Sequence, residues 1–171
     1  AKIVYNRCSQ NSKRSLCLGG AKNHMIVVPD ADTDSTAKGL LASSMGSAGQ
    51  RCMAASVAVG VANIDHIIEQ LVEEANNFKL GVDMGTIISK NALDRITGYI
   101  DEAEKMGAKI LVDGRDISPP VEYENGYWLG ATILDGIDPQ WPSAKEEIFG
   151  PVLSIIRSDT IEEAMKIENN N

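Results

Sequence analysis

The sequence predicts an α/β protein with a mostly parallel sheet and helices on the faces of that sheet. Short β-branched runs, typical of buried strands, alternate with longer segments whose apolar residues recur every three or four positions. Alternation at these lengths favours parallel strands joined by helical crossovers. The 171 residues suffice for one well-buried domain, and the chain has neither an internal repeat nor a low-complexity linker.

Four segments have the apolar spacing of an amphipathic helix, and the N-terminal segment reads as the end of another helix. Asp34 or Ser35 is the expected N-cap of the first full helix, and Gly107 is expected to end the third. In chain order, the expected helices cover residues 1–11, 32–45, 64–78, 89–106 and 160–167.

Six segments are expected to be extended, of which 25–28 is predicted to be a buried strand because of its β-branched run. Turns and loops are expected where glycine, proline and polar residues gather. The expected extended segments are 15–18, 25–28, 55–61, 109–112, 127–134 and 152–156, and the main connections are 19–24, 80–88, 114–126 and 135–144.

The composition excludes several classes of protein. A formal charge of −8 and a pI near 4.7 argue against nucleic acid or an anionic membrane as the main partner. Apolar runs stay well below the roughly 20 residues that a membrane helix needs. Three cysteines without a CxxC pair, and two histidines, argue against a zinc site or a disulfide framework. We therefore expect a reducing compartment, the cytoplasm in a bacterium or the mitochondrial matrix in a eukaryote.

The stretch with most chemical content is residues 46–55, a turn rich in glycine that carries Cys52 directly after Arg51. Glycine allows the backbone to approach a ligand closely. A thiol in such a turn can be a nucleophile if a positive charge or a helix N-terminus favours its thiolate form. The alternative is that Cys52 is a buried small apolar residue.

A second stretch joins the charged run 145–147 to Ile148-Phe149-Gly150-Pro151, which must be buried in part. A carboxylate at the edge of such a turn can accept hydrogen bonds from a ribose diol. A nucleotide-binding fingerprint of the GxGxxG or GxxxxGK[ST] type is absent from the sequence, so this interpretation rests on position alone.

Three separated motifs resemble the NAD(P)-dependent aldehyde dehydrogenase superfamily. They are Leu-Gly-Gly-Ala-Lys-Asn-His at 18–24, Gly-Gln-Arg-Cys-Met-Ala at 49–54 and Glu-Glu-Ile-Phe-Gly-Pro-Val at 146–152. The first two are similar to one branch, the CoA-acylating methylmalonate-semialdehyde (malonate-semialdehyde) dehydrogenases. The resemblance covers nearly the whole chain and implies the three-layer α/β/α catalytic domain of that fold.

The resemblance also implies roles for individual residues. Cys52 matches the nucleophile, which forms a thiohemiacetal with the aldehyde and, after hydride transfer to NAD, a thioester. Glu147 matches the residue that binds the nicotinamide ribose, Phe149 a residue that packs near the nicotinamide, and Gly19 a position whose backbone approaches the cofactor. The oxyanion is held by the nucleophile's own N–H and by an asparagine that the family carries upstream of this segment.

One departure from the hydrolytic members of the family concerns the product. These enzymes carry a glutamate 34 residues before the nucleophile, which activates the water that cleaves the thioester. In this chain the position is Leu18, and neither neighbour is a carboxylate. Hydrolysis is then expected to be slow, so that the thiol of coenzyme A, a co-substrate, intercepts the thioester.

Arg51 is the expected substrate-binding residue. Its guanidinium could hold the carboxylate of a small semialdehyde bidentately, and the branch binds that carboxylate with arginines. The alternative is an outward-pointing salt bridge. Structural roles are expected for His24, for Cys17 as a packed strand residue, for Lys22 as a surface or interdomain contact, and for Arg95 on a solvated helix face.

The resemblance divides the chain into residues 1–18, the tail end of an absent NAD-binding domain, and residues 19–171, a catalytic domain incomplete at its C-terminus. The segment alone is expected to be inactive, and the full-length protein to be a dimeric or tetrameric homo-oligomer with no nucleic-acid or membrane partner and no metal. Two alternatives stay open. They are a hydrolytic aldehyde dehydrogenase that releases a free acid, and a non-catalytic structural module.

Overall fold

The computed structural model describes the backbone of residues 1–171 and all side chains except that of Glu122. The described residues form a five-stranded sheet with the order β1-β2-β5-β4-β3. Neighbouring strands are parallel except for the β3–β4 pair at one edge, which is antiparallel. The strands are β1 (Asn23–Val27), β2 (Ala55–Val61), β3 (Lys109–Val112), β4 (Thr132–Asp135) and β5 (Val152–Ser158). The predicted α/β class is therefore confirmed.

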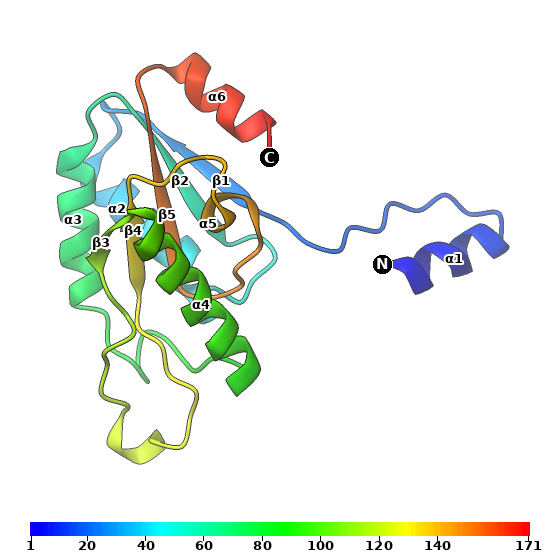
Figure 1. The fold of residues 1–171 in the computed structure, drawn as a ribbon, viewed down its shortest axis with the longest axis horizontal. Helices are drawn as coiled ribbons and strands as arrows, with labels where there is room; N and C mark the ends of the chain where they lie inside the picture. Colours follow the sequence, from blue (N-terminus) through cyan, green and yellow to red (C-terminus); the bar gives the residue numbers. More distant parts are fainter.

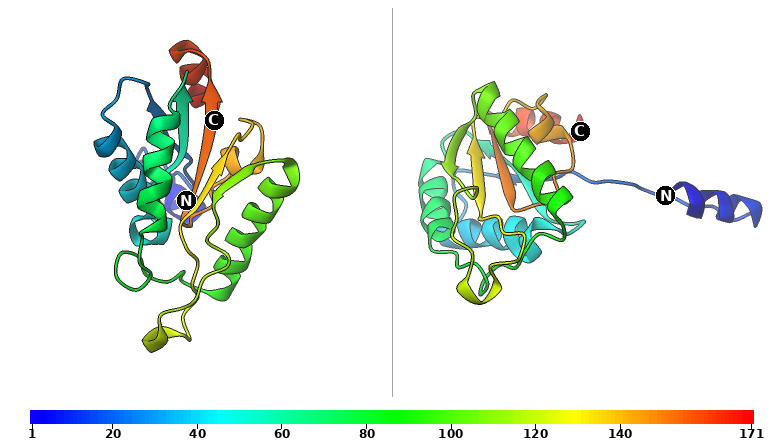
Figure 2. Two further views of the ribbon diagram at one scale, coloured as in Figure 1. Left: turned by 90° about the vertical axis from the view of Figure 1, so that its left-hand side faces the viewer. Right: turned by 60° about the horizontal axis from the view of Figure 1, so that its bottom comes forward.

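Helices cover both faces of this sheet. Helices α2 and α3 pack against each other on one face, and α4 lies on the opposite face (Figures 1 and 2). Helix α6 contacts β1, β2 and β5, and the short α5 contacts α4. The helices are α1 (Lys2–Gln10), α2 (Thr33–Met45), α3 (Asp65–Asn76), α4 (Lys90–Met106), α5 (Pro142–Lys145) and α6 (Ile161–Asn169). Among the helices of the described chain, none is long and apolar enough to span a membrane.

The core is built on β2 and β5, the central strands of the sheet. Both are almost continuously buried along their length. This explains their near-continuous runs of small and β-branched residues, which are typical of strands covered on both faces. Ile67 and Leu71 of α3 and Ile96 and Ile100 of α4 fill the spaces between helices and sheet.

Side-chain caps set the helix ends. Asp32 is the N-cap of α2, and its carboxylate accepts from the Ser35 N–H at 2.9 Å. The N-cap had been predicted at Asp34 or Ser35, two or three positions too late. Ser35 instead lies in the first turn of α2, and its backbone N–H, which has no partner within the helix, donates to the cap. Gly107 ends α4 as predicted, in the left-handed region at φ 106°.

Other sequence predictions need correction. Residues 15–18 form an extended segment without strand pairing, and Leu16 and Leu18 are 85% and 77% exposed. The strand predicted at 25–28 is β1, which lies at the sheet edge with only Val27 buried. The predicted loop 135–144 contains the start of α5, a helix of four residues that is too short to show a period.

The N-terminal arm is separate from the sheet. Helix α1 and the segment after it extend away from the layers (Figures 1 and 2). Every residue of α1 is exposed or half-exposed, including its apolar Ile3, Val4 and Tyr5. Local hydrogen bonds, rather than packing, define this helix within the described chain.

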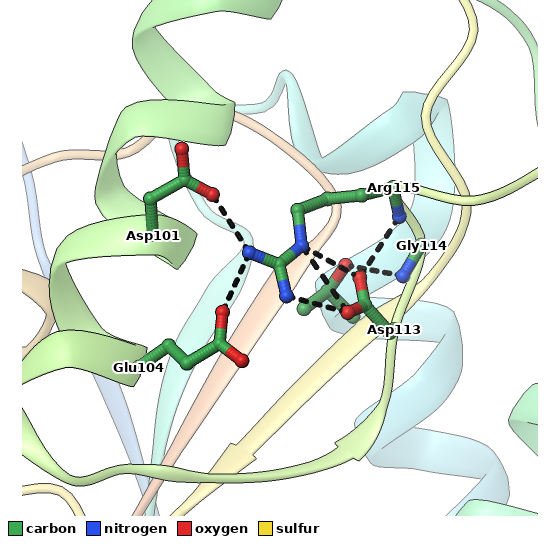
Figure 3. A network of polar contacts seen from close by, with 6 residues as sticks. Asp101, Glu104, Asp113, Gly114 and Arg115 are labelled. Atoms are coloured by element: carbon green, nitrogen blue, oxygen red, sulfur yellow. Dashed lines mark hydrogen bonds and ion pairs between the residues drawn. The ribbon is translucent and has the colours of Figure 1, made fainter.

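An arginine ties α4 to the segment that follows β3. The Arg115 Nη1 lies 2.7 Å from an Asp101 oxygen and 2.8 Å from a Glu104 oxygen, and its Nε and Nη2 bond Asp113 (Figure 3). Three carboxylates converge on one guanidinium, which raises its pKa, with the Asp113 hydrogen bond as the largest cause. The contact fixes the helix relative to the antiparallel edge of the sheet.

Candidate active site

The turn that carries Cys52 begins with a backbone that is unusual for its residues. After α2 ends at Met45, Ser47, Ala48 and Gly49 have φ of 53°, 54° and 66°. The left-handed region costs a residue with a Cβ on the order of 1–2 kcal/mol. Such a conformation persists only when its surroundings hold it in place.

The turn at residues 147–151 supplies that constraint. A Cβ added to Gly49 would lie 2.0 Å from the Gly150 carbonyl oxygen, so the two backbones are in direct contact. Phe149, one residue earlier, is also left-handed at φ 53°. Gly150 is in turn closed in by the Ile96 side chain of α4. Two motifs far apart in the sequence therefore form one packed unit that α4 supports.

Gln50 links this unit to the loop before α4. Its Oε1 accepts from the Ile88 N–H at 2.9 Å, and its Nε2 donates to the Thr86 carbonyl at 3.1 Å. The Gln50 amide thus both accepts from a backbone N–H and donates to a backbone carbonyl, as a peptide group does in a β-sheet. Gln50 therefore attaches the N-terminal side of the Cys52 turn to the loop before α4.

Asn23 holds the same turn from its C-terminal side. The Asn23 Nδ2 donates to the Cys52 carbonyl at 2.9 Å and to the Ala54 carbonyl at 3.0 Å. Cys52 itself is exposed and is a free thiol. The alternative of a buried Cys52 therefore does not hold in this structure, and the thiol is accessible from solvent.

Arg51 contacts the end of α2. Its Nη2 donates to the carbonyls of Ala42 and Ser43 at 2.8 and 2.7 Å, which are among the last acceptors of that helix. Arg51 and Cys52 also line one open hollow of about 620 Å³. The structure thus gives Arg51 a structural contact that the sequence analysis did not anticipate, beside the thiol.

The turn around Glu147 is held by α4. The Glu147 carbonyl accepts from Arg95 Nη1 at 3.3 Å, and the Tyr99 hydroxyl donates to a Glu146 carboxylate oxygen at 2.5 Å. The bond to Glu146 is the largest cause that raises the pKa of Tyr99. Arg95 was predicted to lie on a solvated face. It is exposed, and it also anchors this turn.

The carboxylate of Glu147 faces the glycine segment that precedes β1. Its Oε2 would lie 3.2 Å from a Cβ on Gly20, so Gly20 rather than Gly19 is the glycine beside it. Gly19 is exposed, and its nearest neighbour is the Ala1 side chain. The carboxylate lines a hollow of about 510 Å³ together with Lys22.

Lys22 was expected to be a surface or interdomain contact, but its amine is buried within the described chain. The Nζ atom is buried without a hydrogen-bond partner among the described residues. Burial lowers the pKa of Lys22 to about 8, although the nearby carboxylates of Glu147 and Glu146 act in the opposite direction. The structure therefore places a buried amine with a lowered pKa near the candidate cofactor carboxylate.

Phe149 faces a third hollow, of about 630 Å³, whose lining also includes Gln50, Thr86 and Tyr127. Phe149 is 36% exposed. Cys17 is half-buried in the extended segment, not in the strand that was predicted. His24 lies in β1 with its Nε2 3.3 Å from the Asn171 amide, and burial lowers its pKa.

Sequence reasoning missed Asn23, Gln50 and Tyr99 as parts of this region. Asn23 and Gln50 stand inside the motifs already quoted, and their amides are suited to holding backbone in irregular turns. That signal could have singled them out. Tyr99 lies on the α4 face, and only the tertiary structure brings it to Glu146.

The fold and the site define a class, α/β proteins in which a strained turn presents an exposed thiol next to a second turn that offers a carboxylate and an aromatic ring. The chain belongs to the aldehyde dehydrogenase family, whose model matches residues 1–171.

Its relatives narrow the comparison further. The chain is 40% identical to malonate-semialdehyde dehydrogenase of Pseudomonas aeruginosa over all of its own length and 36% of that protein. It is 42% identical to the mitochondrial acylating methylmalonate-semialdehyde/malonate-semialdehyde dehydrogenase of Rattus norvegicus, with 99% of this chain and 33% of that protein covered. The chain thus spans about a third of the length of these relatives.

Solved structures agree with the sequence relatives. Methylmalonate-semialdehyde dehydrogenase from Oceanimonas doudoroffii matches with a TM-score of 0.89 at 41% identity, over 97% of this chain and 36% of that one. A Sinorhizobium meliloti protein in complex with NAD matches with a TM-score of 0.90 at 43% identity, over 98% of this chain and 35% of that one. The three-layer fold implied by the resemblance is confirmed.

Proposed function

We propose that this chain is the nucleophile-bearing part of an enzyme that oxidises malonate or methylmalonate semialdehyde with NAD and coenzyme A. The products are an acyl-CoA, NADH and CO₂. The observation that carries the proposal is the contact of Gly49 with Gly150, which joins the Cys52 turn to the Glu147–Phe149 turn. Relatives that are 40–42% identical over the chain and named for these substrates support it.

Residues 1–18 are proposed to be the tail end of a cofactor-binding domain, and residues 19–171 to belong to the catalytic domain. The exposed apolar side chains of α1 and of Leu16 and Leu18 support this division, because they lack packing partners within the described chain. Relatives that are about three times as long have room for the remaining domain.

Cys52 is the proposed nucleophile. Its sulfur bonds the aldehyde carbon to give a thiohemiacetal, and the Cys52 N–H stabilises the oxyanion that forms. The fixed turn around Cys52 keeps this N–H in place before the substrate arrives, so that little reorganisation is needed during the reaction. The exposure of the thiol supports access by a small aldehyde.

The residues around Glu147 fit a nicotinamide nucleotide. Among the described residues, hydrogen bonds and ion pairs leave the Glu147 carboxylate unused, so that it is free to accept from a ribose diol. Glu147 would hold the ribose, Phe149 would flank the ring, and the backbone at Gly19 and Gly20 would approach the cofactor. Bound NAD would accept the hydride whose loss leaves a thioester on Cys52.

Release to coenzyme A follows from the residue at position 18. Leu18 and its neighbours Cys17 and Gly19 offer no carboxylate to activate water. The CoA thiol then displaces Cys52, so that a new carbon–sulfur bond forms and Cys52 leaves as a thiolate. The bond between the substrate carboxylate and the α-carbon breaks to release CO₂, and the α-carbon, which stays in the acyl group, takes up a proton.

Arg51 is proposed to bind that carboxylate before it leaves. Arg51 and Cys52 line the same hollow, and the hydrogen bonds from Arg51 to described residues use Nη2. Because Nη2 is committed to α2, the carboxylate would pair with the remaining N–H groups of the guanidinium.

Replacement of Arg51 tests this role in the full-length protein. Arg51→Leu should raise KM for malonate semialdehyde at least tenfold more than KM for propanal, which has no carboxylate to bind. Propanal therefore serves as the control for loss of the α2 contact. An equal effect on both aldehydes would remove Arg51 from the substrate site.

Product analysis tests the function as a whole. The full-length protein with malonate semialdehyde, NAD and CoA should form NADH and acyl-CoA in equal amounts, and Cys52→Ser should abolish both. A free acid that forms at the same rate with and without CoA would instead identify the hydrolytic enzyme. An inactive full-length protein whose Cys52 reacts with iodoacetamide no faster than Cys8 would identify the structural module.

The setting of the protein is proposed from its relatives. The mammalian and insect relatives are named as mitochondrial, and bacterial relatives also occur. We propose the cytoplasm for a bacterial source and the mitochondrial matrix for a eukaryotic one, with assembly into a homo-oligomer. Size-exclusion chromatography with light scattering of the full-length protein tests the assembly.

A further inference from the structure

We propose that Asn23 is a positioning residue for Cys52, whose side-chain amide fixes the peptide after the cysteine and thereby the direction of the thiol. The effect of Asn23 on the turn is independent of what the protein catalyses. Its effect on turnover rests on the proposed function.

Apart from the hydrogen bonds of Arg51 to α2, the side chains of the turn supply little packing, so the turn needs such an anchor. Arg51, Cys52 and Met53 are all exposed, Met53 to 89%. A single backbone bond, from the Ala54 N–H to the Arg51 carbonyl at 3.1 Å, closes the turn internally. Exposed turns of this kind sample several conformations unless polar contacts restrict them.

Asn23 supplies two such contacts at once. Its Nδ2 lies 2.9 Å from the Cys52 oxygen and 3.0 Å from the Ala54 oxygen. The two hydrogens of one primary amide satisfy two carbonyls that flank the turn, a pairing that neither a carboxylate nor a single hydroxyl can reproduce. Because the Cys52 carbonyl is fixed, the ψ torsion of Cys52 is restricted. This restricts the position of the Cβ that carries the thiol.

Strand β1, which carries Asn23, is paired with β2 and is irregular at this point. Asn23 pairs with Ala55 and His24 with Val57, so the β1–β2 register shifts between Asn23 and His24. An irregularity of this kind re-aims a side chain at the end of a strand. It brings the Asn23 amide to the carbonyls of the turn, while β1 stays paired with the buried β2.

The test compares Asn23→Ala and Asn23→Asp with a matched control, Asn77→Ala, in the full-length protein. Asn77 also donates its Nδ2 to a backbone carbonyl, that of Glu73 at 3.0 Å, but at the end of α3. Thermal unfolding of each variant checks that the fold is retained. Hydrogen exchange of the Ala54 amide and steady-state kinetics with semialdehyde, NAD and CoA are then measured.

Both Asn23 variants should speed exchange of the Ala54 amide about tenfold or more, and kcat should fall about tenfold or more. KM for NAD should stay within about twofold, since the Glu147 turn is untouched. Asn77→Ala should change none of these values. Unchanged exchange of the Ala54 amide would overturn the proposal. A fall in kcat together with a rise in KM for NAD and a lower melting temperature would also overturn it, because that combination indicates a general structural role. If the unaltered protein shows no turnover, the proposed function fails, and Ala54 exchange alone decides the role of Asn23.

Discussion

Lys22 carries a charge that the fold disfavours. Its Nζ is buried without a hydrogen-bond partner among the described residues, although the carboxylates of Glu146 and Glu147 lie near enough to act on it. The cost of burial exceeds the gain from these charges, and the pKa of Lys22 falls from 10.5 to about 8. The pKa of an Asp or Glu side chain at the surface rarely shifts by as much, because solvent screens its charge.

The consequence is a predicted rise in stability with pH. Between pH 8 and 10.5 the unfolded chain keeps the Lys22 proton that the folded chain has lost, so the free energy of unfolding increases as the pH rises through this window. The increase is about 3 kcal/mol at most, for a shift of this size. Urea unfolding at pH 7.5 and pH 10 should show it, and Lys22→Met should lack it. Because other groups titrate equally in both proteins, an identical pH response of the two would contradict the assignment.

At the scale of elements, the contact between the two turns is the critical junction. The Gly49 and Gly150 backbones touch, and left-handed residues lie on both sides of the contact. Neither turn would keep its conformation alone, because each holds residues in a costly region of φ. Helix α4 supports the junction through Ile96, Arg95 and Tyr99.

A single methyl group should separate the turns. Gly49→Ala places a Cβ 2.0 Å from the Gly150 oxygen at a positive φ, and should lower the free energy of unfolding by about 3 kcal/mol. Gly98→Ala is the matched control, since nothing lies within 4 Å of its Cβ position in α4. That change should raise stability by about 0.5–1 kcal/mol. Urea denaturation measures both, and a Gly49→Ala protein as stable as Gly98→Ala would rule out the junction.

At the scale of the whole molecule, the chain forms one five-stranded sheet with a separate N-terminal arm (Figure 1). The sheet and its two helical layers are continuous, whereas α1 and the segment after it extend from them (Figure 1). The chain covers about a third of its relatives. We propose that the catalytic domain holds Cys52 and Glu147, and that the full-length protein supplies the rest of the cofactor site.

This division predicts that the 171-residue chain by itself is inactive. With malonate semialdehyde, NAD and CoA, the purified chain should produce no more NADH than its Cys52→Ser variant. The reason is that one ribose-binding carboxylate cannot by itself bind a dinucleotide. Absorbance at the NADH band measures the product, and turnover that depends on Cys52 in this chain would contradict the division.

The sequence was sufficient for most of the architecture because the buried strands and amphipathic helices depend on local pattern. Strand β2 was predicted with its exact bounds, and α4 was predicted to within one residue of its start and with its exact end. Residues 15–18 have a short apolar pattern, yet they pair with no strand of the described chain. Pairing is a tertiary property, so the pattern alone could not decide it.

The candidate site divides in the same way. Cys52, Glu147 and Phe149 could be proposed because they stand in motifs that resemble those of a known family. The bonds of Asn23 to the Cys52 turn and the commitment of Arg51 to α2 could not, because they depend on how segments meet. The burial of Lys22 likewise becomes visible only when the hollow beside Glu147 is formed.

The most direct test of the account is the acyl group on Cys52. The full-length protein is mixed with semialdehyde and NAD, without CoA, quenched in acid, digested and analysed by mass spectrometry. The account predicts an acyl adduct on the peptide that contains Cys52, sensitive to hydroxylamine as a thioester is, and removed when CoA is added before the quench. An adduct on Cys8 or Cys17, or NADH formation without any adduct that CoA discharges, would contradict it.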